Sequence, residues 1–96
     1  MKAYKHLVKH CLANNCLVSV WDGEEWQLTM SSSYKAIIAA IESVEEAQIR
    51  IIDKYTSEKM GWALIIPFGL EDDETVADNT MTAFMEAWDA AYQVNT

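Results

Sequence analysis

Three stretches of the chain place apolar residues at helical spacing and predict amphipathic helices. The first covers residues 2–12, the second residues 34–44, and the third lies near the C-terminus with a start between Asp73 and Thr80. In each stretch the apolar residues recur at i, i+3, i+4 and i+7, so they would share one side of a helix. These stripes are Tyr4, Leu7, Val8 and Cys11; Tyr34, Ile37, Ile38, Ile41 and Val44; and Met81, Phe84, Met85, Trp88, Ala91 and Tyr92.

Four other stretches predict β-strands. Leu17 to Trp21 is rich in bulky apolar residues, and Glu25 to Met30 alternates between apolar and polar positions. The intervening Asp22-Gly23 pair is typical of a hairpin turn. Two further strands are expected over residues 47–53 and 60–68.

The length of the first hairpin loop affects which side chains share a face of the sheet. A loop of two or four residues puts Trp21 beside Trp26, whereas a three-residue loop would turn Val18 and Val20 inward instead. In the last predicted strand we expect the main apolar stripe to consist of Trp62, Leu64 and Ile66.

The predicted elements follow the order helix, strand, strand, helix, strand, strand, helix. A sheet whose one face is packed against helices would bury both the helical stripes and one side of the strands. The chain has 96 residues, a typical length for one domain. We therefore expect a single α+β domain over residues 1–96, with a four-stranded, mainly antiparallel sheet and two or three helices against it.

Composition narrows the class of protein. Hydrophobic residues make up 51% and charged residues 23%, as in an ordinary globular domain. The net charge of −8 argues against non-specific nucleic-acid binding, which depends on neutralising phosphates. Lysines and histidines interrupt the N-terminal segment, and the longest apolar run covers only residues 62–68, so we expect neither export nor membrane insertion. Two closely spaced cysteines, Cys11 and Cys16, suggest reduced thiols in a cytoplasmic protein.

Few residues form a pattern that indicates chemistry. His6 and His10 share a helix side, but a zinc site with the two cysteines would require a sharp fold-back, so solvated histidines are the favoured interpretation. The four acids of residues 71–74 either bind a hard cation or complement the positive end of the following helix, and the second alternative is favoured. No nucleophile–base arrangement and no phosphate-binding glycine loop is present, so we predict neither an enzyme nor a cofactor.

Charge is distributed unevenly along the chain. Residues 1–21 carry +3, which leaves −11 for residues 22–96, and no basic residue follows Lys59. On the last predicted helix, Asp78, Glu86 and Asp89 would lie on the side opposite the apolar stripe. These acids either keep the protein in solution or steer it toward a basic partner surface. The candidate partner-binding residues are Glu71, Asp72, Asp73, Glu74, Asp78, Glu86 and Asp89.

The four tryptophans suggest a second type of interaction. One sheet face has limited room for Trp21, Trp26 and Trp62, so core packing competes with a contact to another chain, and a homo-oligomer is the alternative function. Binding of a small nucleotide ranks lowest, because the sequence shows no cluster of bases for its phosphates.

Three segments carry a resemblance to a known group of proteins: Gly61–Pro67, Glu74–Asn79 and Met85–Trp88. In these segments the chain resembles small, uncharacterised, acidic accessory proteins of tailed bacteriophages. The resemblance carries no functional residues. It implies an inhibitor of host defence, of the anti-CRISPR or anti-restriction type, in the cytoplasm of a bacterial host. Together with the charge pattern, it leads to the expectation of a non-enzymatic protein that occupies the basic nucleic-acid-binding surface of a host protein without binding nucleic acid itself.

Overall fold

A computed structural model describes residues 1–69 and 71–94. Position 70, which precedes the four acids of residues 71–74, lies outside the described residues. Three α-helices, five strands and one 3-10 helix follow one another along the chain. They are α1 (Ala3–Ala13), β1 (Cys16–Trp21), β2 (Trp26–Ser31), α2 (Tyr34–Glu42), β3 (Ala47–Asp53), β4 (Lys59–Ile65), η1 (Asp72–Thr75), β5 (Val76–Asn79) and α3 (Ala83–Val94).

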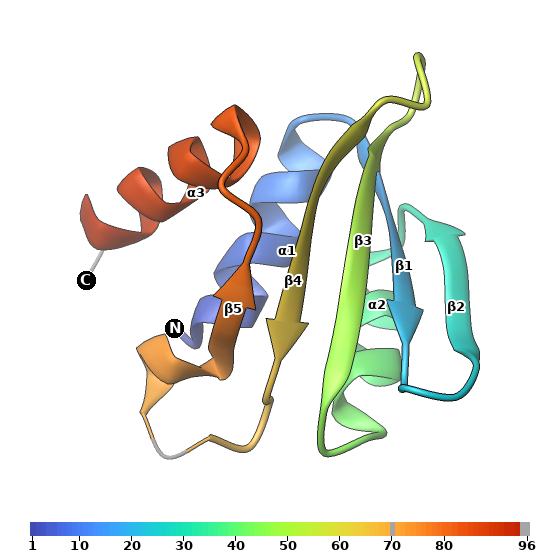
Figure 1. Cartoon of the computed structure of the whole chain (residues 1–96), viewed down its shortest axis with the longest axis vertical. Helices are drawn as coiled ribbons and strands as arrows, with labels where there is room; N and C mark the ends of the chain where they lie inside the picture. The colour runs from blue at the N-terminus through green and yellow to red at the C-terminus, as the bar shows by residue number, and fades with distance from the viewer. Residues whose placement is uncertain (70, 95–96) are drawn as a thin grey trace.

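The strands form one antiparallel sheet in the order β2-β1-β3-β4-β5. Helices α1 and α2 lie behind this sheet in Figure 1, and α3 lies beside α1 near the β5 edge. No helix among residues 1–69 and 71–94 covers the opposite face, which points toward the viewer. The α+β class with helices on the sheet is therefore confirmed, and one face of the sheet is left open.

The sheet has five strands, so the prediction of four is wrong. Val76–Asn79 was expected to lie at or just before the start of the last helix, but it pairs with β4, with Leu64 opposite Asp78. Its sequence has weak strand propensity, and the pairing arises because the outer edge of β4 offers unpaired backbone groups. The backbone N–H of Thr80 donates to the carbonyl of Trp62 over 3.0 Å and extends this pairing. As a result α3 begins only at Ala83, after the predicted range of starts.

The core lies between the helices and the covered face of the sheet. Its largest fully buried side chains include Tyr4, Leu7, Val8, Val18, Val20, Ile37, Ile41, Ile49, Ile51, Ile65 and Met85. In α3, Trp88 and Tyr92 are buried as expected, whereas Met81 precedes the helix and is 79% exposed. The helical stripe of α1 is confirmed, because all four of its apolar residues are buried. In α2, Ile37 and Ile41 are buried and Tyr34 and Ile38 half-buried, whereas Val44 lies beyond the end of the helix.

The apolar stripe predicted for the last strand is wrong. Ala63 and Ile65 face the core, so Trp62 and Leu64 point to the open face, and Ile66 follows the end of β4. The cause is the close approach of α3 to the covered face. A Cβ on Gly61 would lie 2.6 Å from Cγ of Met85, so that side of β4 accepts only small side chains there.

The first hairpin combines the two arrangements that were predicted as alternatives. Its loop has four residues, Trp21 pairs with Trp26 as that length predicts, and yet Val18 and Val20 face the core. Both hold because neighbouring residues of β1 alternate between faces, so the tryptophan pair lies on the open face. Oδ1 of Asp22 accepts hydrogen bonds from the backbone N–H groups of residues 24 and 25, each over 2.7 Å, and these bonds lower the pKa of Asp22.

Candidate functional site

The acidic residues expected to bind a partner lie on η1, β5 and α3, except Glu71, which directly precedes η1. We call this surface the acidic edge and define it by Glu71, Asp72, Asp73, Glu74, Asp78, Glu86 and Asp89, all of which are exposed. In Figure 1, β5 lies along the outer edge of β4, with η1 at its lower end and α3 beyond its upper end. The placement of Asp78 on the last helix is wrong, because Asp78 belongs to β5. The seven residues come from one side of the fold nonetheless.

A buried threonine holds η1 against the first helix. Thr75 is fully buried, and its hydroxyl donates to the carbonyl of Asp72 over 2.8 Å. The same oxygen accepts the backbone N–H of Tyr4 over 3.3 Å. Nearby, the ammonium of Lys2 donates to the carbonyl of Pro67 over 3.0 Å. The acidic segment is thus tied to the N-terminus of α1.

The carboxylates of the acidic edge are not neutralised by ion pairs within residues 1–69 and 71–94. In this part of the chain the one ion pair joins Lys5 to Glu42, with 3.8 Å between Nζ and Oε2. The pKa of Tyr92 is raised, first by burial and then by the charges of Asp73 and Asp72. Asp72 and Asp73 of η1 are therefore near enough to Tyr92 of α3 to act on its hydroxyl.

The prediction that the two histidines are solvated is wrong. Nδ1 of His6 accepts a hydrogen bond from Nε1 of Trp88 over 3.1 Å, and its ring meets Tyr92 edge-on at 5.3 Å between centroids. The His10 ring lies 5.0 Å from that of Phe84, and burial, followed by the charge of His6, lowers the pKa of His10. Both histidines thus pack between α1 and α3. The prediction failed because the spacing of residues within α1 does not reveal that a second helix covers this side.

The cysteines are free thiols inside the core. Cys11 and Cys16 are both buried, and burial raises the pKa of each thiol. A raised pKa keeps a thiol protonated and a poor nucleophile at neutral pH. Within the described chain no group of three or more histidine, cysteine, aspartate or glutamate side chains is arranged to hold a metal ion.

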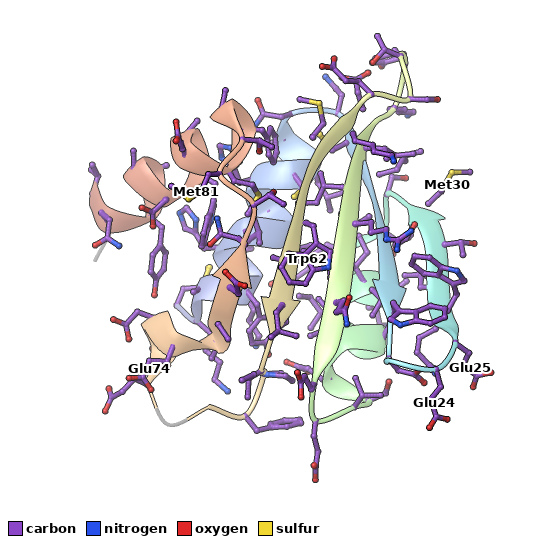
Figure 2. All side chains as sticks on the ribbon, viewed as in Figure 1. Glu24, Glu25, Met30, Trp62, Glu74 and Met81 are labelled. Atoms are coloured by element: carbon purple, nitrogen blue, oxygen red, sulfur yellow. The ribbon has the colours of Figure 1, made fainter. Side chains whose placement is uncertain are left out.

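A second candidate surface is the open face of the sheet, which the charge pattern did not indicate. Here the rings of Trp21 and Trp26 meet edge-on at 5.0 Å, and the guanidinium of Arg50 lies 5.0 Å from the centre of the Trp26 ring. Nε1 of Trp62 donates to Oε1 of Gln48 over 3.2 Å. Figure 2 shows Trp62 at the middle of this face and Met30 at its β2 side. Aromatic and cationic groups from four strands are therefore brought together.

These side chains surround a concavity of about 510 Å³. Its residues come from β1, β2, β3, β4 and the segment after β5, and we call it the sheet concavity. The lining consists of Ser19, Trp26, Met30, Arg50, Ile51, Ile52, Lys59, Gly61, Trp62, Thr80 and Thr82. Among these described residues there are two cations and no carboxylate. Arg50 lies in a predicted strand, whereas Lys59 was expected in the loop just before the next one, and the structure shows that β4 begins at Lys59 and pairs with β3.

Comparison of the chain with protein-family models, with curated proteins and with solved structures finds no match. In the described part of the chain, no helix has the length and apolar character needed to cross a lipid bilayer.

Proposed function

We propose that this protein is a non-enzymatic binding module whose acidic edge occupies a basic surface of another protein. The observation that carries the proposal is the gathering of seven exposed carboxylates from η1, β5 and α3 without an ion-pair partner in the described chain. Such a surface attracts a cationic partner over a distance of about one Debye length, roughly 10 Å at moderate salt. Attraction of this kind raises the association rate and selects the partner by charge.

The hydrogen bonds that attach η1 and β5 to the rest of the fold support binding rather than mere solubility. β5 is paired along β4, and the Thr75 hydroxyl connects η1 to α1. Carboxylates on a fixed frame lose less conformational freedom on binding than carboxylates on a loose tail. A fixed array of negative charge can also replace phosphates on a surface that normally binds nucleic acid. On the expectation that this is a phage accessory protein, we take the partner to be a host nucleic-acid-handling defence protein, as in anti-CRISPR or anti-restriction inhibition.

Charge reversal at the acidic edge tests this proposal. The test variant is Asp72→Lys, Asp73→Lys, Glu86→Lys, and the matched control is Glu24→Lys, Glu25→Lys, Glu45→Lys, which changes the net charge equally at other exposed positions. Each protein is used to capture partners from a bacterial lysate at about 50 mM and about 300 mM salt, followed by mass spectrometry. The dissociation constant of the captured protein is then measured with and without competing nucleic acid.

The proposal predicts that the wild type and the control capture the same nucleic-acid-binding protein at low salt. The test variant should bind that protein at least tenfold more weakly, higher salt should release it, and nucleic acid should compete with it. Equal capture by the two variants, or capture that salt does not weaken, would contradict the proposal.

A homo-oligomer is the second candidate function. It is favoured by one observation, the position of Trp21, Trp26 and Trp62 on the open face of the sheet. Aromatic side chains are enriched in protein interfaces, so this face could join two copies. Light scattering separates the candidates, because a mass that equals one chain and does not change with concentration excludes a subunit contact.

A further inference from the structure

The sheet concavity has the opposite charge to the rest of the protein. The chain carries seven lysines and arginines against fifteen acids. Even so, the concavity is lined by Arg50 and Lys59 and by no described carboxylate. The antiparallel β3–β4 register causes this, because it places Arg50 opposite Trp62 and Lys59 opposite Ile52. Two basic residues that are nine positions apart in the sequence thereby line the sheet concavity.

The cation beside Trp26 is arranged to bind an anion. The guanidinium of Arg50 lies 5.0 Å from the centre of the Trp26 ring. An arginine stacked on an aromatic face keeps its N–H groups free at the edge of its plane, where they can hold phosphate or carboxylate oxygens. In the described chain no ion pair involves Arg50 or Lys59, so neither charge is neutralised by a carboxylate.

The same hollow offers an aromatic platform. Trp62 lies at the concavity and is anchored by the hydrogen bond from its Nε1 to Gln48. Flat aromatic ligands stack on such side chains. A volume of about 510 Å³ lies within the range of small-molecule sites, roughly 300–1,000 Å³. Ring surface and cationic groups therefore lie within reach of a single small ligand.

We infer that the sheet concavity is a binding site for a nucleoside monophosphate. Its nucleobase lies against the indole of Trp62, and its phosphate is held by Lys59 and by Arg50, which lies over the ring of Trp26. This site is distinct from the acidic edge and does not depend on the function proposed for it. The sequence did not reveal a nucleotide site because the two cationic side chains that would hold the phosphate are brought together only by strand pairing.

The surroundings of the concavity favour one nucleotide over a nucleic-acid strand. At one end of the strands, Asp22, Glu46 and Gln48 line a second, smaller hollow, and Asp78 lies on the outer strand β5. A longer strand leaving the concavity in these directions would bring its phosphates toward carboxylates, and repulsion between like charges disfavours that path. A single phosphate can stay between the two cations.

The test is calorimetric titration of the full chain with adenosine monophosphate, with adenosine, and with ribose 5-phosphate. The variants are Arg50→Gln, Lys59→Gln and Trp62→Leu, with Trp62→Phe as a variant that keeps an aromatic face. The matched control is Lys35→Gln, which removes an exposed positive charge from α2, away from the concavity. Circular dichroism checks that each variant is folded, and exposed Arg50 and Lys59 can be replaced without removing a core side chain.

Saturable binding of adenosine monophosphate is expected, with adenosine and ribose 5-phosphate each binding at least tenfold more weakly. Arg50→Gln, Lys59→Gln and Trp62→Leu should each weaken binding roughly tenfold, while Trp62→Phe and Lys35→Gln should change it less than about threefold. The absence of saturable heat up to about 10 mM nucleotide, or equal affinity of all three folded variants and the control, would overturn the assignment. Tighter binding of a ten-nucleotide oligodeoxyadenylate than of the mononucleotide would overturn the restriction to a single nucleotide.

Discussion

Nε1 of Trp88 donates a hydrogen bond to Nδ1 of His6 over 3.1 Å, which joins the last helix of the chain to the first. An accepting Nδ1 means that the neutral imidazole carries its proton on Nε2. The His6 ring also meets Tyr92 edge-on, one helical turn beyond Trp88. The position of α3, and with it that of Glu86 and Asp89, therefore depends on a polar contact as well as on apolar burial.

Trp88→Phe should lower the free energy of unfolding by about 1–3 kcal/mol, because it removes the donor and part of the buried ring. Chemical denaturation measures this loss. A double-mutant cycle with His6→Phe should give a coupling of about 0.5–1.5 kcal/mol for the hydrogen bond. Additive losses in the cycle would show that the hydrogen bond contributes nothing to stability.

Thr75→Val should lower the free energy of unfolding by about 1–3 kcal/mol. Valine has the shape of threonine but leaves the N–H of Tyr4 and the carbonyl of Asp72 without their hydroxyl partner. Thr75→Ser keeps the hydroxyl and serves as the control, with a smaller loss from the missing methyl group. If Thr75→Ser lowers the free energy of unfolding more than Thr75→Val does, the hydroxyl is not what holds η1 to α1.

Gly61→Ala should destabilise the protein by about 1–3 kcal/mol, because its Cβ would lie 2.6 Å from Cγ and 2.9 Å from Sδ of the fully buried Met85. Thermal unfolding of the single variant and of Gly61→Ala combined with Met85→Ala measures the effect. The double variant should be more stable than the sum of the two single losses predicts, because the shorter side chain makes room for the added methyl group. Additive losses would argue against a clash between these two positions.

Stability should depend on pH through His10. Burial lowers the pKa of His10 in the folded protein below the value of about 6.5 expected for the unfolded chain, so the unfolded chain binds more protons near pH 6. The contribution of neutral His10 to the free energy of unfolding is therefore fully present above about pH 7. It is lost as the pH falls through the pKa of His10 in the unfolded chain and then through its lower pKa in the folded protein. Thermal midpoints between about pH 5 and 8 should fall on acidification, and His10→Gln should flatten this slope. An unchanged slope in the variant would assign the pH dependence to other groups.

The helices and most strands could be predicted because their signals are local. A stripe at i, i+3, i+4 and i+7 in Tyr34–Val44, or alternation in Glu25–Met30, depends only on residues next to one another in the chain. Strand β5 could not be predicted in this way. Its four residues have little strand propensity, and it forms because β4 presents a free edge.

The two candidate surfaces also differ in whether their residues are close together in the sequence. The acids of residues 71–74 are contiguous, so their shared exposure was visible in the sequence, although the wrong element was predicted for Asp78. The sheet concavity combines Trp26, Arg50 and Lys59 from three strands. Their proximity depends on strand order and register, which neither periodicity nor composition contains.

By itself, the sequence determined the α+β class, the apolar sides of α1 and α2, and the gathering of negative charge after Lys59. Tertiary structure alone decided that the histidines pack under α3, that β4 turns Ala63 rather than Trp62 inward, and that two cations share a hollow on the open face. The physical reason is the separation along the chain of the residues that interact. Periodicity and charge follow from neighbours along the chain, whereas pairing and close packing depend on which distant segments meet and how much room each leaves the other.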